Sequence, residues 1–447
     1  MKCFDSCFNK LKNNKNLILI FLVTFSIYLL NLPIDYSKSL ETKVARRLLN
    51  SNDVTAATFI PYEVIKYGTL FFSDDTVSAM RRAQSHDKDL YSVIYKNNHY
   101  VSAMPILAGI MAIPFYVLPV LLNKIPSLQY YEDLVKILTL ARIAASFYTA
   151  VSVVIFYLIL KEIDILKSYK TDKWTYVFLA LFAFGTNVYS IASRTLWQHT
   201  SSLFLVTIVI YLMLKSITDK KYVKYMGLFA ALVYVARPLN IIFVFLLTGY
   251  VFFKYRDQFI KYILYALPIA FLLFTYNIYS WGQPFTTEYV EKSDTSFSTP
   301  LWYGAFGYLV SPSRSFLFIT PPLVLSYYAM FLVFTKKKKI DFDLMLIVLS
   351  ITYILIFIMY SMWHDWAGGD RFGYGFFTEW VPIVSVLTYT IVKPLKKVGK
   401  IIFMVLMIWS LYTQFNAVWF RKSRCAGDSH NWTFYCIQPQ FLTVQEY

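Results

Sequence analysis

The chain consists of long, continuous apolar runs separated by short polar segments. A helix needs about 20 apolar residues to cross a bilayer, and runs close to that length follow one another between residues 17 and 420. They lie at 17–34, 103–122, 136–160, 175–192, 201–217, 225–254, 262–280, 314–335, 340–362, 377–393 and 400–420. Strands that span a membrane alternate apolar and polar residues, and these runs do not. The sequence therefore predicts an all-α, polytopic integral membrane protein with about 11–13 transmembrane helices.

The composition excludes several classes of protein. Of the 447 residues, 57% are hydrophobic and 15% are charged, whereas soluble domains carry about 25% charged residues. The mean hydropathy is +0.49. These values exclude a disordered chain, a nucleic-acid-binding arm and an ordinary cytosolic enzyme. The net charge of +17 comes from Lys tracts between the apolar runs, which we interpret as a sign of membrane topology and not of nucleic-acid binding.

Positively charged residues mark the cytoplasmic ends of membrane helices. Lys residues before the first run predict a cytoplasmic N-terminal tail over 1–16, followed by a transmembrane domain over 17–420. Further clusters predicted to be cytoplasmic are Lys167–Lys173, Lys215–Lys224, Lys254–Lys261, Lys336–Lys339 and Lys393–Lys400. The segments predicted to face outward are 35–102, 193–200, 281–313, 363–376 and the C-terminal tail 421–447.

One part of this topology is inconsistent. If 103–122 runs inward and 136–160 runs outward, the basic segment Lys161–Lys173 lies outside the cell. Either 103–122 does not cross the membrane completely, or an additional turn lies near 123–135. The sequence leaves both alternatives open.

The outward tail carries two features of extracytoplasmic segments. Cys425 and Cys436 are predicted to form a disulfide, because disulfides persist outside the cytoplasm. Asn431-Trp432-Thr433 matches the short glycosylation sequon.

The first outward loop, 35–102, is long enough to suggest function, since most connections in compact domains are short. We expect it to contain amphipathic helices, the first over 40–50, where apolar residues three and four positions apart indicate a helix on the membrane surface. Asp53 follows this helix and is either a general base or the N-cap of the next helix. Glu63 lies further along the same loop and is a second candidate for the site.

Arg237 lies in the middle of the apolar run 225–254 and is followed by Pro238. Because Pro interrupts the helical hydrogen-bond ladder, we predict two short helices that meet at this point. An ionisable residue within a membrane segment suggests function, and an Arg can bind a phosphate through two parallel hydrogen bonds. The alternative is that Arg237 reaches toward the membrane interface.

The loop from Trp363 to Gly375 combines carboxylates, cations, aromatic rings and glycines. Its candidate binding residues are His364, Trp366, Asp370 and Arg371. The alternative is an interfacial aromatic belt with a tight turn. We favour function, because a belt does not require Asp and Arg together with Gly.

Two further candidates face outward in this topology. Arg314 follows Ser311-Pro312-Ser313 and is predicted either to bind a second phosphate or to pair with a carboxylate such as Asp370. His199 follows Trp197-Gln198 and is either a ligand or part of a helix end. Together the outward candidates would form a polar site above a hydrophobic groove, which suits a substrate with a lipid tail, a phosphate and a sugar.

Several short segments resemble the polytopic membrane glycosyltransferases of the GT-C type, and more closely a bacterial branch of them. This superfamily includes the protein O-mannosyltransferases and the aminoarabinose transferases. The segments that carry the resemblance are Ser51-Asn52-Asp53 with Ile60-Pro61 and Tyr67-Gly68-Thr69-Leu70, Asn98–Ser102 with Met104-Pro105 and Ile113–Tyr116, Ala236-Arg237-Pro238, Asn277 with Gly282-Gln283-Pro284, Gly307–Arg314, and Trp366–Gly369. The resemblance covers roughly residues 17–420 through short, degenerate motifs.

The resemblance implies a reaction. Asp53 would be the catalytic base, and Arg237 would contact the phosphate of a lipid-linked sugar. The branch usually has Gly-Pro-Arg after its Gly-Gly pair, whereas this chain has Gly373-Tyr374-Gly375, so Arg371 would take the place of the missing Arg. The sugar would be transferred with inversion from a polyprenyl-phosphate carrier to an acceptor hydroxyl.

The implied partners are the lipid-linked donor, a glycan, lipid or protein acceptor, and membrane lipid, with no nucleic acid. No cofactor is implied. A divalent metal, for which Asp74-Asp75 is one conceivable pair, is not required. The expected location is the inner (plasma) membrane, with the active site on the extracytoplasmic side.

Two other functions remain open from the sequence. The first is a flippase or another transporter of lipid-linked sugars, which would need access from both faces of the membrane. The second is a non-catalytic subunit that assembles an envelope complex. The absence of charged residues from the inner halves of the predicted spans weighs against transport.

Overall fold

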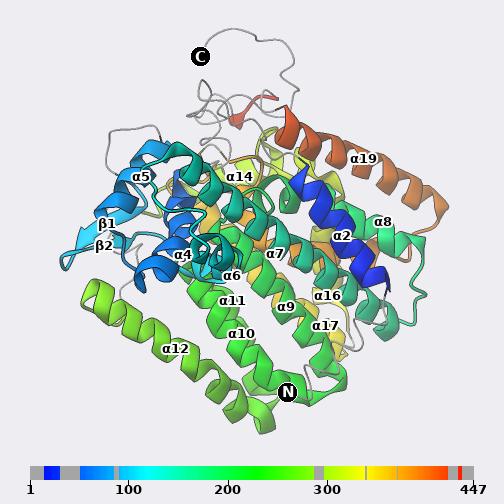
Figure 1. Cartoon of the computed structure of the whole chain (residues 1–447). Helices are drawn as coiled ribbons and strands as arrows, with labels where there is room; N and C mark the ends of the chain where they lie inside the picture. The colour runs from blue at the N-terminus through cyan, green and yellow to red at the C-terminus, as the bar shows by residue number, and fades with distance from the viewer. Residues whose placement is uncertain are drawn as a thin grey trace.

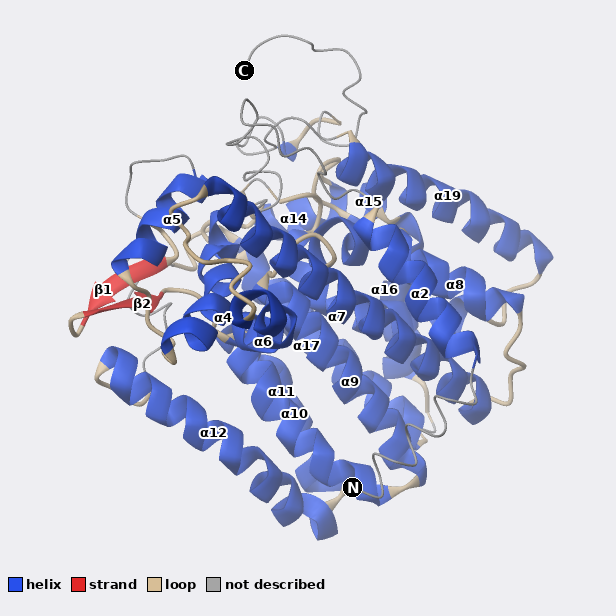
Figure 2. Ribbon diagram, viewed as in Figure 1, coloured by secondary structure: helices blue, strands red, loops and turns tan. Residues whose placement is uncertain are grey.

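The computed structural model describes residues 15–30, 51–84, 90–285, 296–337, 340–369, 371–420 and 431–434. Helices make up almost all of the regular structure in these residues, as Figure 2 shows. The helical class predicted from the sequence is confirmed for them. The predicted features that lie outside the described residues are the helix over 40–50, the Cys425–Cys436 pair and Asp370.

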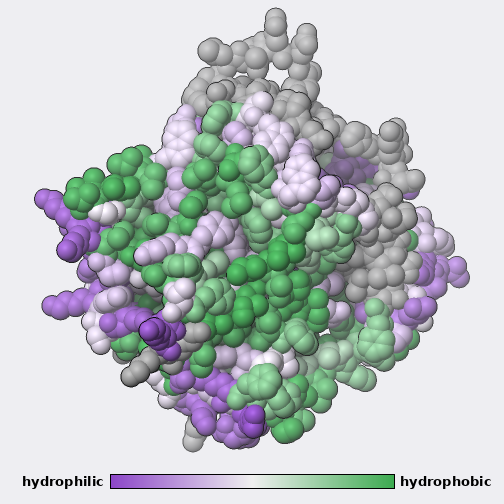
Figure 3. Space-filling model, turned by 180° about the vertical axis from the view of Figure 1, so that it is seen from behind, coloured by the Kyte–Doolittle hydropathy of each residue, from purple (hydrophilic) through white to green (hydrophobic). Residues whose placement is uncertain are grey.

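Six described helices have the length and apolar composition needed to cross a membrane. They are Tyr131–Leu166 (α7), Gln198–Thr218 (α9), Arg256–Trp281 (η6 with α12), Asp341–Ser361 (α17), Gly375–Val392 (η8 with α18) and Lys397–Trp419 (α19). Shorter apolar helices are Lys15–Leu29 (α2), Leu107–Leu121 (α6), Lys173–Phe184 (α8), Pro238–Lys254 (η5 with α11), Leu301–Val310 (α14) and Pro321–Thr335 (η7 with α16). On the face in Figure 3, apolar residues spread over the middle and hydrophilic residues gather at the edges. This is the pattern of a multi-pass membrane protein.

Helix α9 lies inside the bundle and packs against α7, α10 (Val223–Ala236), α17 and α18. Figure 1 shows α2 and α7 on one side of it and α10 and α11 on the other. Helix α12 lies at the edge of the bundle, against α10, and most of its surface is exposed. Gly227 permits this contact, because a Cβ atom there would lie 1.9 Å from the carbonyl oxygen of Tyr262.

Helix α7 connects two ends of the molecule. Near its start, Arg142 donates hydrogen bonds to the carbonyl oxygens of Tyr28 and Arg194. Near its end, Asp164 accepts a hydrogen bond from Tyr389. At 1.5 Å per residue, Arg142 and Asp164 are roughly 33 Å apart along the helix axis, close to the thickness of a hydrocarbon core of about 30 Å. We call the end that holds Arg142 the site end and the end that holds Asp164 the Lys-rich end.

The Lys clusters predicted to share one face lie together at the Lys-rich end. Ion pairs there join the ends of different helices. They are Lys215–Glu162 at 3.0 Å, Lys254–Asp341 at 3.1 Å, Lys336–Asp343 at 2.5 Å, Lys393–Asp172 at 2.9 Å and Lys393–Asp164 at 3.5 Å. The grouping of these segments agrees with the one expected from their charge.

Two helices of the segment 35–102, which was predicted to be the first outward loop, form a cap at the site end. Helix α4 (Thr55–Tyr67) is buried along its first two turns and packs against α6. Helix α5 (Asp74–Gln84) is amphipathic, with Val77 and Met80 buried and Arg81 and Arg82 exposed. The amphipathic helix predicted over 40–50 lies outside the described residues.

A β-hairpin also belongs to this loop, and the all-α prediction did not include it. Strand β1 (Val93–Lys96) pairs with β2 (His99–Ser102) in antiparallel register. The turn residues Asn97 and Asn98 both have positive φ, at 52° and 63°. A two-residue turn of this kind matches the twist of the strands, and Asn tolerates the conformation better than most residues.

The short helix α6 explains the inconsistent topology. It has 15 residues and contains Pro114 and Pro119, so at about 1.5 Å per residue it is only roughly 22 Å long. That is less than a hydrocarbon core of about 30 Å. This length agrees with the first of the two alternatives, in which 103–122 does not cross completely.

Two of the predicted runs have a different internal structure. The run 314–335 is not one helix, because Pro321 and Pro322 separate α15 (Phe316–Ile319) from α16 (Leu325–Thr335). The predicted loop 281–313 contains the helix α14. The run 225–254 is divided at Arg237-Pro238 into α10 and α11 (Ile241–Lys254), as predicted from the proline.

Candidate functional site

Asp53 and Arg371 form an ion pair between the segment 35–102 and the loop Trp363–Gly375, which we call the glycine-rich loop. The Arg371 Nη2 atom donates to Asp53 Oδ2, and the two side chains are 13% and 20% exposed. Both groups are therefore within reach of a ligand. The alternative role of Asp53 as an N-cap is wrong: Ser51 caps the 3-10 helix η2 (Asn52–Val54), and α4 begins without a side-chain cap.

Two aromatic rings hold the guanidinium of Arg371. Its Cζ lies 4.9 Å from the ring centre of Trp197 and 4.7 Å from that of Phe376. Gly375 leaves room for the side chain, because a Cβ atom there would lie 2.9 Å from the Cβ of Arg371. Cation–π contacts of this kind hold the planar guanidinium in a fixed orientation. The rings of Trp197 and Phe376, which we call the aromatic seat, thus hold Arg371 toward Asp53.

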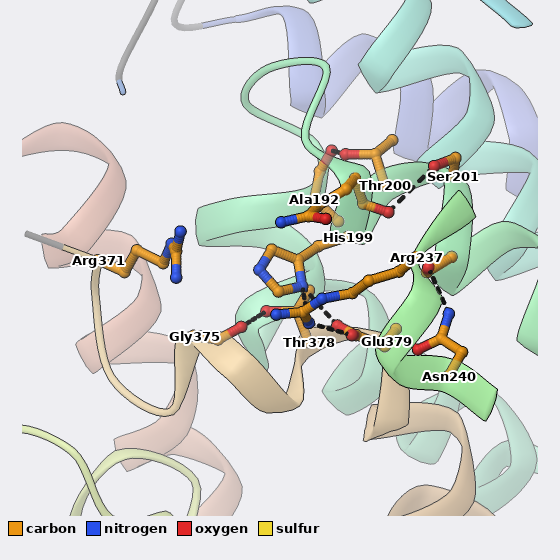
Figure 4. A network of polar contacts seen from close by, with 12 residues as sticks. Ala192, His199, Thr200, Ser201, Arg237, Asn240, Arg371, Gly375, Thr378 and Glu379 are labelled. Atoms are coloured by element: carbon orange, nitrogen blue, oxygen red, sulfur yellow. Dashed lines mark hydrogen bonds and ion pairs between the residues drawn. The ribbon is translucent and has the colours of Figure 1, made fainter. Parts of the chain in front are cut away.

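A second ionic cluster lies deeper, between α9, the α10–α11 break and η8 (Figure 4). Glu379 accepts from Arg237 Nη1 through Oε1, and its Oε2 is 2.5 Å from His199 Nδ1. All three side chains are at most 2% exposed. Arg237 also lies over the rings of Tyr360 and Phe376, at 5.2 and 5.7 Å from their centres. The alternative in which Arg237 reaches the membrane interface does not describe this structure.

The contact with Glu379 orients His199. Nδ1 lies 2.5 Å from Glu379 Oε2 and 3.2 Å from Arg237 Nη1, so this edge of the ring faces the ion pair and Nε2 lies on the opposite edge. Nε2 is buried and has no hydrogen-bond partner among the described residues. In Figure 4 the ring edge that carries Nε2 is turned away from Glu379, toward the side on which Arg371 lies.

Arg314 is buried and holds the glycine-rich loop in place. Its Nε donates to Asn431 Oδ1 at 2.9 Å, its Nη2 to the Gly369 carbonyl at 2.8 Å, and its Nη1 to the Arg371 carbonyl. The predicted pairing with Asp370 lies outside the described residues. The contacts make Arg314 a support for Arg371, since they fix the backbone from which that side chain extends.

Trp366 and Glu63 are also buried in supporting contacts. Trp366 is 4% exposed and packs edge-on against Tyr308. Its ring also lies against Gly307, where a Cβ atom would clash with it. Glu63 accepts from the backbone and hydroxyl of Ser73 at 3.1 and 2.8 Å and so ties α4 to the start of α5. His364, in contrast, is exposed. Of the predicted site residues, the structure brings together Asp53 with Arg371, and Arg237 with His199.

Some residues of this region were not singled out from the sequence. Glu379 is the most important, and its signal was an acid at the start of the apolar run 377–393, where a charge is costly unless it is paired. Trp197 and Phe376 are the other two, and their seat for Arg371 depends on contacts between distant segments.

A small cleft lies beside the break at Pro238. It is bordered by α12 and by the segment between β2 and α6, with Ser102 and Asn277 among its polar residues. Its volume of about 30 Å³ accommodates water but not a sugar. Within the described ranges, no three His, Cys, Asp or Glu side chains are grouped in a way that could hold a metal ion.

Comparisons of the chain with protein-family models, with curated proteins and with solved structures each found no match.

Proposed function

We propose that the chain is a membrane glycosyltransferase that moves a sugar from a polyprenyl-phosphate carrier to an acceptor hydroxyl on the extracytoplasmic side. The observation that carries this proposal is the Asp53–Arg371 ion pair. It joins the two loops that the GT-C resemblance singles out, and it combines a candidate base with a candidate phosphate ligand. Several apolar helices around it could span a membrane, as a lipid-linked donor requires.

The ion pair suggests how the site changes when a donor binds. A phosphate group competes with the Asp53 carboxylate for Arg371, since an Arg binds a phosphate through two parallel hydrogen bonds. Asp53 is then released close to the reacting centre. The aromatic seat of Trp197 and Phe376 keeps Arg371 in position during this exchange.

Transfer would follow a single displacement with inversion. The acceptor oxygen bonds to the anomeric carbon while its proton passes to the Asp53 carboxylate. The bond between that carbon and the phosphate oxygen breaks, and the electron pair remains on the leaving phosphate. Arg371 stabilises the charge that develops there, and Asp53 acts as the general base. Arg237, which pairs with Glu379 in the deeper cluster, would add its positive charge to this region without contacting the phosphate.

The orientation in the membrane follows from charge. The Lys-rich end would face the cytoplasm and the site end would face outward, in a bacterial inner membrane. The acceptor would be a glycan, a lipid or a protein, and no metal enters the proposed steps.

The proposal is tested by chromatography of lipids from cells fed radiolabelled sugar nucleotides. We expect a polyprenyl-phosphate sugar to accumulate when the gene is deleted. Asp53→Asn should not reverse this, because loss of a general base slows transfer by about 10²–10⁴-fold. The matched control is Asp75→Asn, which changes an exposed carboxylate of the same loop and should restore the normal lipid profile.

Two results would overturn the proposal. Transport of a lipid-linked sugar by purified protein that persists in Asp53→Ala would favour a flippase. Full complementation by Asp53→Asn, with an unchanged lipid profile in the deletion strain, would favour a non-catalytic assembly subunit.

A further inference from the structure

Arg194 is a largely buried cation at the site end that has no counterion among the described residues. It lies in the turn between the π-helical segment η3 (Val188–Ala192) and α9. Its Nη1 atom is buried without a hydrogen-bond partner, and no carboxylate pairs with it among the described residues. Burial lowers the pKa of its guanidinium to about 10, so the group still carries its charge at neutral pH. An unpaired charge in such a place is costly unless a ligand compensates it.

The same turn holds two further polar atoms without partners. Trp197 Nε1 and His199 Nε2 are both buried, and neither has a hydrogen-bond partner in the described part of the chain. The side chains themselves are 3% and 0% exposed. Buried polar groups in folded proteins are nearly always hydrogen-bonded. Three unmatched groups within the short turn 194–199 therefore point to a polar ligand.

The turn is next to the ion pair of the proposed site. Arg371 lies over the ring of Trp197. Ile191, one turn before Arg194, lies beside Gly375, because a Cβ atom on Gly375 would be 3.3 Å from Ile191 Cδ1. The backbone of the turn is fixed by Arg142, whose Nη1 donates to the Arg194 carbonyl at 2.5 Å. Arg194 is thus held in a defined place.

The charges of this region do not balance. Five arginines and three carboxylates lie in or beside it within the described residues. The arginines are Arg142, Arg194, Arg237, Arg314 and Arg371, and the carboxylates are Asp53, Asp365 and Glu379. Glu379 pairs with Arg237, and Asp53 pairs with Arg371. The excess is positive, and it indicates an anionic ligand.

We propose that Arg194, together with Arg371, binds the phosphate of the substrate. This inference rests on the proposed function and deepens it, since it assigns the phosphate to residues different from Arg237 and Arg314. Those two arginines already donate to Glu379 and to the glycine-rich loop respectively. Arg371 exchanges its carboxylate partner for the phosphate, and Arg194 gains the counterion that it lacks. Trp197 Nε1 donates to the same group.

The test uses purified full-length protein in detergent, with farnesyl phosphate as the probe. Farnesol, which lacks the phosphate, and inorganic phosphate, which lacks the lipid, are the two reference ligands. Binding is measured by intrinsic tryptophan fluorescence and stability by thermal unfolding. We expect Arg194→Gln to raise the dissociation constant for farnesyl phosphate about tenfold or more, as expected for the loss of a charge-assisted hydrogen bond. Binding of farnesol should not change.

The second readout separates a binding role from a structural one. Without ligand, Arg194→Gln should melt at the same temperature as the wild type or higher, because the substitution removes an uncompensated charge. The matched control is Arg81→Gln, which removes the same charge from the exposed face of α5 and should change neither property. Arg142→Gln should lower the melting temperature, since Arg142 donates to two carbonyl groups.

Three outcomes would overturn the inference. They are unchanged affinity in Arg194→Gln, a melting temperature that falls as far as in Arg142→Gln, and a wild type that does not bind farnesyl phosphate. Equal affinity of the wild type for inorganic phosphate would assign the subsite to a free phosphate instead of a lipid. Arg194-dependent binding without sugar transfer would support the subsite and reject the glycosyltransferase. Sugar transfer at the wild-type rate in Arg194→Gln would support the glycosyltransferase and reject the Arg194 subsite.

Discussion

The two ends of the molecule each contain a buried ionic cluster, and the clusters differ in how completely they are bonded. At the Lys-rich end, Lys393 donates to Asp164, Asp172, Thr175 and the Lys170 carbonyl. Asp164 also accepts from Tyr389 at 2.7 Å and from Thr175 at 3.0 Å. Every polar atom of the Lys393 and Asp164 side chains has a partner. This cluster connects the ends of α7, α8 and α18 and so stabilises their packing.

The cluster at the site end is not saturated. Glu379 joins Arg237 and His199, but His199 Nε2 has no hydrogen-bond partner in the described residues, and neither does Arg194 Nη1. Unmatched buried polar atoms lower stability unless a ligand or water satisfies them. The comparison suggests that the Lys-rich end is built to hold helices together and the site end to receive a polar ligand.

The largest expected effect on stability comes from removing the one carboxylate of the deep cluster. Glu379→Gln removes the carboxylate that pairs with the buried guanidinium of Arg237 and contacts His199. Breaking a buried pair in this way costs about 3–5 kcal/mol, to be measured by chemical or thermal unfolding in detergent. The control is Glu162→Gln, which breaks the more exposed pair with Lys215 and should cost less than about 1 kcal/mol. Equal costs for the two variants would contradict the central place of Glu379.

An apolar replacement of the saturated cluster should leave activity unchanged, whereas the same replacement at the site end should abolish it. Lys393→Met should cost less than Glu379→Gln, because Asp164 keeps its donors Tyr389 and Thr175. The double variant Lys393→Met/Asp164→Leu should recover most of that stability, since a buried pair is often replaceable by apolar groups. Sugar transfer per folded molecule should equal that of the wild type.

The corresponding double variant at the site end sharpens the contrast. Arg237→Met/Glu379→Leu removes both charges of the deep pair and should likewise recover stability relative to Glu379→Gln. Transfer activity should nevertheless be lost. If activity survived there, or disappeared in the Lys393/Asp164 double variant, the assignment of function to one end and structure to the other would fail.

Much of the fold was predictable because hydropathy and charge act locally. Apolar runs predicted α7, α9 and α17 closely, and Pro238 predicted the break that positions Arg237. The Lys segments were correctly grouped, since all of them respond to the same physical rule. The errors arose where local signals conflict, as at Pro321-Pro322, which divide an apolar run, and at Asn97-Asn98, whose turn is short.

The site was predictable only in part. Asp53, His199, Arg237 and Arg371 could be selected individually, because charged groups and histidines are rare in and around apolar runs. Their pairing could not, since Asp53 meets Arg371 across most of the chain and no local pattern encodes that contact. The supporting role of Arg314 depends in the same way on carbonyl groups of a distant loop.

The smallest expected change in stability tests the seat of Arg371 directly. A Cβ atom at Gly375 would lie 2.9 Å from the Cβ and 3.1 Å from the Cδ of Arg371, with Ile191 also close at 3.3 Å. Gly375→Ala should therefore displace Arg371 from Asp53 while lowering the stability by only about 1 kcal/mol. We expect at least a tenfold loss of transfer activity, because small misplacements of a catalytic group are costly. Gly249→Ala is the matched control, since a Cβ atom there meets nothing within 4 Å, and it should leave transfer unchanged. Equal activity of the two variants would show that the position of Arg371 does not limit the reaction, and the site end would then lose the feature that distinguishes it from the Lys-rich end.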